Sequence, residues 1–103
     1  MQILYDYRGR PVRLTDERLG HILGHPEMRD LEPALLETLA QPELVLQSVS
    51  DSQAILSYRL LPHTVFGVKW MCVVVKYRED DAFVLTAYLT DRPKKGTQLW
   101  PST

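Results

Sequence analysis

The sequence lacks most of the features that would assign it at once to a specialised class of protein. It has a single cysteine, Cys72, in 103 residues, so a disulfide framework within the chain and a cysteine zinc site are both excluded. Its formal net charge is -1, which argues against a general polyanion-binding protein, because such proteins carry a surplus of basic residues. A local basic patch remains compatible with this charge balance.

Long apolar runs are absent as well. No stretch approaches the roughly 18 residues that a membrane-spanning helix needs, and the opening residues MQILYDYRGRP have no apolar core of the signal-peptide kind. We therefore expect a cytoplasmic protein without a membrane partner. Cys72 lies in a valine-rich run, where we interpret it as a small buried hydrophobic residue in a reducing compartment.

What the sequence does contain is enough apolar material for one core, since 45% of its residues are hydrophobic. We expect residues 1–103 to form a single domain. Residues 70–90, WMCVVVKYREDDAFVLTAYLT, predict a long antiparallel hairpin around a charged turn. Strand alternation then gives the second strand two faces. One face, expected to pack against helices, carries Phe83, Leu85, Ala87 and Leu89; the other carries Val84, Thr86, Tyr88 and Thr90.

The rest of the sequence predicts helices followed by strands. Residues 1–14 predict a short ribbon or arm, and Thr15 is a suitable cap for a helix that ends before Pro26. A second helix is expected from about residue 30 until Pro42, followed by strands at 44–49 and 54–61, a loop at 62–67 and an irregular basic tail at 91–103. The order predicts an α+β fold, with N-terminal helices packed on one face of a four-stranded, or slightly larger, antiparallel β-meander.

Three polar residues share one side of the first predicted helix. Arg18, His21 and His25 follow i, i+3, i+7 spacing, which places them within one arc away from the leucine stripe. Histidine suits proton transfer near neutral pH, and a neighbouring guanidinium could hold a phosphate. The alternative is an ordinary solvated helix face. A zinc site is the weakest option, since Ile22 stands where an HExxH motif needs glutamate.

Lys76 is a lone cation after three valines. If the strand register brings it to the face of Thr86, Tyr88 and Thr90, a cation lies among three hydroxyls and could bind a phosphodiester. The alternative is that these residues simply suit a half-exposed strand.

A basic cluster of Arg92, Lys94 and Lys95 follows the strand that carries the hydroxyls, with Trp100 close behind. Cations beside an aromatic ring suit backbone neutralisation and base stacking. An ordinary solvated tail can have the same composition. The sequence contains no glycine-rich phosphate loop, serine hydrolase signature or acidic metal cluster.

The order of these motifs adds a resemblance. The segments TDERLGHILGHPEM, TLAQP, VVVKY, LTAYLT and KKGTQLW together resemble phage- and mobile-element-associated nucleases of the barnase/EndoU/colicin/RelE-like class, over most of residues 15–100. The resemblance implies a helical part followed by a four-stranded antiparallel sheet, and metal-independent RNA cleavage without a cofactor, often as a toxin. It raises RNA, including a specific tRNA, as the substrate and an inhibitory antitoxin or immunity protein as a partner.

Carried onto this sequence, the resemblance implies His21 as the acid or base and Lys76 as the phosphate-stabilising cation. The candidate catalytic residues are therefore His21, Lys76, Tyr88, Thr86 and Thr90, and the candidate substrate-binding residues are Arg18, His25, Arg92, Lys94 and Lys95. The leading hypothesis is a toxin-like endoribonuclease that cleaves RNA by attack of the 2′-OH on the phosphodiester. The alternatives are a non-catalytic module that binds protein or nucleic acid, and a purely structural domain. The nuclease hypothesis requires His21 and Lys76 to share one cleft.

Overall fold

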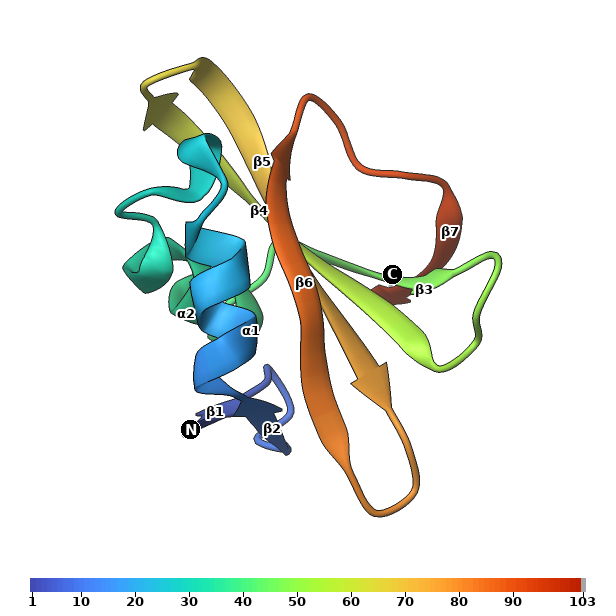
Figure 1. The fold of residues 1–103 in the computed structure, drawn as a ribbon. Coiled ribbons are helices and arrows are strands. Elements are labelled where there is room, and N and C mark those ends of the chain that lie inside the picture. The colour runs from blue at the N-terminus through green and yellow to red at the C-terminus, as the bar shows by residue number, and fades with distance from the viewer. Residues whose placement is uncertain (103) are drawn as a thin grey trace.

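The computed structural model describes residues 1–102, which form seven strands, two α-helices and one short 3-10 helix (Figure 1). In chain order the elements are β1 (Gln2–Tyr5), β2 (Pro11–Leu14), α1 (Asp16–Leu23), η1 (Pro26–Met28), α2 (Glu32–Ala40), β3 (Leu44–Ser48), β4 (Ala54–Thr64), β5 (Gly67–Tyr77), β6 (Ala82–Thr90) and β7 (Gly96–Trp100). None of these helices is long and apolar enough to cross a membrane.

All seven strands of the described chain belong to one mixed sheet, in the order β1-β2-β6-β5-β4-β3-β7. Neighbours are antiparallel except β2 and β6, which run parallel and meet at the Arg13 and Phe83 pair. The prediction of a four-stranded antiparallel meander is therefore wrong. Strands β3 to β6 are consecutive antiparallel neighbours, but the sheet also contains the N-terminal ribbon on one side and β7 on the other.

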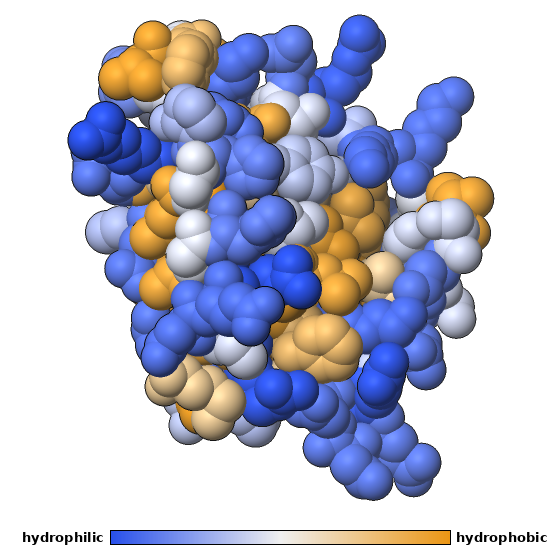
Figure 2. All heavy atoms as spheres, viewed as in Figure 1, coloured by the Kyte–Doolittle hydropathy of each residue, from blue (hydrophilic) through white to orange (hydrophobic). Residues whose placement is uncertain are grey.

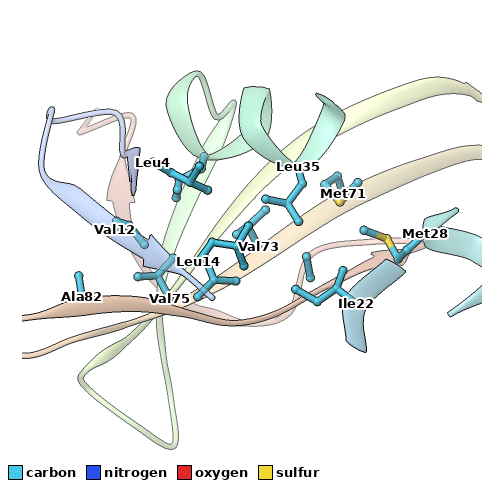
Figure 3. Packing of buried hydrophobic residues seen from close by; sticks show 13 residues of the cluster. Leu4, Val12, Leu14, Ile22, Met28, Leu35, Met71, Val73, Val75 and Ala82 are labelled. Atoms are coloured by element: carbon cyan, nitrogen blue, oxygen red, sulfur yellow. The ribbon is translucent and has the colours of Figure 1, made fainter. Parts of the chain in front are cut away.

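The helices cover one face of this sheet. Thr15 caps α1 by accepting a hydrogen bond from the Arg18 backbone N–H at 3.1 Å, and the helix ends at Leu23, ahead of Pro26. The main core lies between this layer and the sheet, as Figure 3 shows. Its fully buried members include Ile22, Met28, Leu35 and Leu39 from the helical layer and Met71, Val73 and Val75 from β5.

A second, smaller cluster lies on the opposite face of the sheet. It contains Leu46, Leu56, Tyr58 and Cys72, with Leu44, Trp70, Val74 and Tyr88 packed against it. Here β3 and β7 bend away from the plane of β6, as Figure 1 shows, so this face becomes concave. Strand β5 is thus buried on both faces, which explains its nearly continuous apolar sequence.

A bulge changes the predicted faces of β6. Val74 pairs with Thr86 but Val75 pairs with Val84, so Leu85 has no partner across the ladder. In the part of β6 before Leu85, each side chain therefore points to the face opposite to the one that simple alternation predicts. Val84 is accordingly buried in the main core, with 3% of its surface exposed. The expectation that Val84 lies with the hydroxyl-bearing residues and Phe83 against the helices is therefore wrong, because one extra residue inverts every side chain before it.

Two other segments differ from the sequence prediction. Strand β4 continues through Pro62 to Thr64, where a loop was expected; the register shifts between Leu61 and Thr64, so proline falls where ladder pairing is already interrupted. The tail expected to be irregular contains β7, which pairs with β3. Short polar strands such as Gly96–Trp100 carry little periodic signal, which is why the sequence did not reveal it.

Gly96, at the start of β7, allows this pairing to be tested. A Cβ atom there would lie 2.5 Å from the Gln47 carbonyl oxygen of β3. We expect Gly96→Ala to lower the free energy of unfolding by about 1–3 kcal/mol, because the backbones must move apart. Gly20→Ala is the control, since its Cβ would meet nothing within 4 Å inside α1 and should stabilise by about 0.5–1 kcal/mol. Urea unfolding measures both, and an unchanged midpoint for Gly96→Ala would contradict the close approach.

Candidate functional site on the concave sheet face

The concave, helix-free face of the sheet holds a groove. Strand register places Tyr88 opposite Cys72 and Thr86 opposite Val74, so these four side chains project from the same face. The cavity volume is about 370 Å³, and Figure 2 shows the hollow beside β6, with apolar side chains on its floor and hydrophilic ones around it. Its lining is formed by Ser48, Val49, Ser50, Ala54, Leu56, Val74, Thr86, Tyr88, Lys94 and Lys95.

Tyr88 is the central polar residue of this groove. The Lys94 amine lies over its ring, 5.8 Å from the ring centroid. The electron-rich face of the ring attracts the positively charged amine in this arrangement. Its hydroxyl oxygen is buried and has no hydrogen-bond partner among residues 1–102. Burial raises the pKa of Tyr88 above its ordinary value, so the phenol stays protonated. An unpaired buried hydroxyl carries a desolvation cost, and because this oxygen has no exposed surface, Tyr88 can offer the groove its ring but not its hydroxyl.

Tyr58, which lies under the groove in the smaller core cluster, holds the loop between β6 and β7 that carries Lys94 and Lys95. This residue is fully buried, and its hydroxyl accepts a hydrogen bond from the Lys94 backbone N–H at 3.1 Å. Burial raises the pKa of Tyr58 to about 12. The ring also meets Trp70 edge to face, with centroids 6.5 Å apart. The position of Lys94 is therefore set by a buried side chain rather than by the loop alone.

Lys76 lies at the edge of the groove but is not the lone cation expected from the sequence. Its amine forms a salt bridge with Asp51 in the turn between β3 and β4. The hydrogen bond from Lys76 holds the pKa of the Asp51 carboxyl below its usual range. This pair ties the turn that carries Ser50 to β5, so Lys76 shapes the groove wall and its charge is already balanced.

Two other predicted residues lie beyond the groove lining. The Thr90 hydroxyl donates to the Arg92 carbonyl oxygen at 3.1 Å, and Thr90 stands opposite Trp70 in the sheet. Arg92 is exposed in the same connection. Both residues therefore shape the start of the loop that carries Lys94 and Lys95.

The residues expected to supply acid and base lie in the helical layer, on the opposite side of the sheet from the groove. Arg18, His21 and His25 are all exposed, on or just after α1, whose Ile22 packs into the core on the opposite face of the sheet. His25 is not helical, because α1 ends at Leu23; its ring nevertheless meets that of His21 edge to face, with centroids 5.4 Å apart. The sheet therefore separates these groups from the groove, and no shared cleft with Lys76 is formed.

Sequence reasoning thus brought together Thr86, Tyr88, Lys94 and Lys95, but it missed the role of Tyr58. Strand alternation puts Tyr58 and Arg59 on opposite faces of β4, and the register with β5 shows that Tyr58, which stands opposite Cys72, is the one on the groove face. Ser48 and Ser50 were also missed, because they join the groove only through the bend of β3. Within residues 1–102 no three His, Cys, Asp or Glu side chains gather to hold a metal ion.

Comparison of the chain with family models, with curated proteins and with solved structures finds no match in any of the three. The resemblance to nucleases therefore remains a prediction.

The unpaired Tyr88 hydroxyl gives a test of this geometry. Tyr88→Phe removes a buried group without a partner, so we expect the free energy of unfolding to stay the same or to rise by up to about 1 kcal/mol. Tyr77→Phe is the matched control: the Tyr77 hydroxyl donates to the buried Asp6 carboxylate at 2.6 Å, and its loss should destabilise by about 1.5–3 kcal/mol. Equal destabilisation by the two variants, measured in urea, would contradict the assignment.

Proposed function

We propose that this protein binds single-stranded RNA along the concave sheet face, as a non-catalytic module of the cytoplasm. The observation that carries the proposal is the placement of Lys94 and Lys95 over a groove that contains Tyr88 and Thr86. Two cations beside hydroxyls and an aromatic ring are the groups that a ribose-phosphate strand requires. The net charge of -1 restricts this electrostatic attraction to a local patch, which favours a short segment over a long polyanion.

Each part of the groove has a separate task in this proposal. Lys94 and Lys95 neutralise phosphates, while Thr86, Ser48 and Ser50 offer hydroxyls to phosphate and ribose oxygens. The apolar floor, formed by Leu56 and Val74, contacts unstacked bases, which only a single strand can present. The buried Tyr58 hydroxyl holds the loop in place before the RNA arrives, and this lowers the ordering cost of binding.

The double variant Lys94→Gln, Lys95→Gln tests the binding proposal. Loss of two phosphate contacts should reduce the slope of log affinity against log salt by about 1.4 and weaken binding to a short single strand in 50–200 mM salt by roughly tenfold or more. Arg18→Gln is the control, because it removes one exposed positive charge from α1, which lies on the opposite side of the sheet from the groove. Fluorescence anisotropy with a labelled oligonucleotide measures both.

Equal loss of affinity in the groove variant and in Arg18→Gln would contradict the proposal, since attraction would then be general rather than local. Absence of any wild-type binding to single-stranded RNA would contradict it as well.

The second candidate is metal-independent ribonuclease activity in the same groove, favoured by the two lysines that line it beside the Tyr88 ring. The 2′-oxygen would attack phosphorus, one lysine amine would stabilise the crowded phosphate, and the other would protonate the leaving 5′-oxygen. The products are a 2′,3′-cyclic phosphate and a 5′-OH, with the 2′-OH proton passing to solvent. A toxin-like nuclease of this kind would need an inhibitory protein that covers the groove.

Incubation with varied RNAs in EDTA separates the two candidates. Groove catalysis requires the cyclic phosphate to appear, the Lys94→Gln, Lys95→Gln double variant to lower the rate at saturating RNA by about 10²-fold, and His21→Ala to leave it unchanged. A product that disappears in His21→Ala but not in the lysine double variant would contradict the groove mechanism. Binding without any cyclic phosphate would leave the non-catalytic module as the function.

A further inference from the structure

A second cavity lies where the two edges of the sheet approach each other. Strands β1 and β7 stand at opposite ends of the strand order, yet the turn between β1 and β2 reaches β7, with the Tyr7 and Trp100 ring centroids 6.0 Å apart. We call this region the seam. Its cavity volume is about 250 Å³, and its lining consists of Asp6, Tyr7, Arg8, Arg10, Ile55, Tyr77 and Leu99.

The seam cavity is separate from the groove. Ala54 lines the groove and the next residue, Ile55, lines the seam cavity, so consecutive residues of β4 point to opposite faces of the sheet. Ile55 stands opposite Val75 of the main core, which places the seam cavity on the side of the sheet that carries the helices.

The carboxylate in the seam is already satisfied. Asp6 is only 7% exposed, and it accepts hydrogen bonds from the backbone N–H groups of Arg8 and Arg10, both at 2.9 Å, and from the Tyr77 hydroxyl at 2.6 Å. Three donors on one carboxylate fix the shape of the turn. Its negative charge is offset by the guanidinium groups of Arg8 and Arg10, which line the same cavity.

The two guanidinium groups of the seam differ in their availability. Arg10 lies over the Tyr77 ring at 5.2 Å and donates to the carbonyl oxygens of Arg78 and Asp81, so it is committed to the turn between β5 and β6. Arg8 is exposed and lies over the Tyr7 ring at 5.3 Å. Its guanidinium forms no ion pair or hydrogen bond with any residue in the described range 1–102.

We propose that the seam cavity binds one nucleoside monophosphate unit, with the base against Tyr7, Ile55 and Leu99 and the phosphate on Arg8. An aromatic ring beside aliphatic side chains suits the planar face of a base, and a free guanidinium suits a phosphate bidentately. The cavity is smaller than the usual 300–1,000 Å³ or so of a pocket for drug-sized ligands, which fits a single base. The inference rests on the proposed function and deepens it, since an RNA strand that leaves the groove around the edge strand β7 would meet a second, base-accepting subsite on the other face of the sheet.

Titration with adenosine 5′-monophosphate, followed by amide and indole chemical shifts, tests the site. We expect the largest shifts at Tyr7, Arg8, Ile55 and the Trp100 indole. Arg8→Gln should weaken binding by roughly tenfold through loss of one charge-assisted contact, while it keeps the Tyr7 and Trp100 contact. Arg29→Gln, which removes an exposed charge after η1, should leave the affinity unchanged. Adenosine without phosphate should bind about as weakly to wild type as the monophosphate does to Arg8→Gln.

The inference is overturned if the shifts map to Thr86 and Lys94, if no shifts occur in the folded protein, or if Arg8→Gln and Arg29→Gln behave alike. Its failure is distinct from failure of the groove proposal, because the Lys94 and Lys95 double variant leaves the seam residues intact. Retained monophosphate binding in that double variant, beside lost RNA affinity, supports both sites.

Discussion

Burial of β5 on both faces is the constraint on which the rest of this structure depends. Met71, Cys72 and Val73 are consecutive residues, and none has measurable exposure. One face is covered by α1 and α2, in the manner expected of a two-layer domain. No helix covers the other face in residues 1–102, so the sheet itself must bend until Leu46, Tyr58 and Tyr88 close over Cys72. The groove is a consequence of this bend.

The sequence contains the information for the local elements but not for their pairing. Thr15, Pro26 and Pro42 set the helix limits by backbone chemistry that acts within a few residues, and these limits could be predicted. The parallel contact between Arg13 and Phe83 joins residues 70 apart in the chain, and nothing in either segment specifies it. The bulge at Leu85 is similarly hidden, because alternation in the sequence continues through it.

The same distinction explains the outcome for the candidate site. Thr86 and Tyr88 could be placed together because they share one strand, and Lys94 and Lys95 because they follow it directly. His21 could not be placed, since its spacing defines a helix face but not which side of the sheet the helix covers. Lys76 shows a further limit: a cation that is isolated in the sequence is paired in space with Asp51, from a turn 25 residues earlier. Charge balance is a tertiary property, and strand alternation does not reveal it.

The attachment of the N-terminal ribbon has a consequence for how the molecule opens. Strands β1 and β2 pair with the larger sheet at a single register position. The polar contacts that add to it come from side chains: the Arg13 and Asp81 ion pair, which is more than a third exposed on each side, and the hydrogen bonds of Asp6 with Tyr77 and of Arg10 with the turn between β5 and β6. Backbone pairing therefore contributes little to holding the ribbon. Val12 and Leu14 are instead almost completely buried in the main core, so release of the ribbon would expose that core to water. The N-terminus accordingly belongs to the cooperative unfolding unit, and a chain shortened to begin after Leu14 would lose part of its interior rather than a dispensable arm.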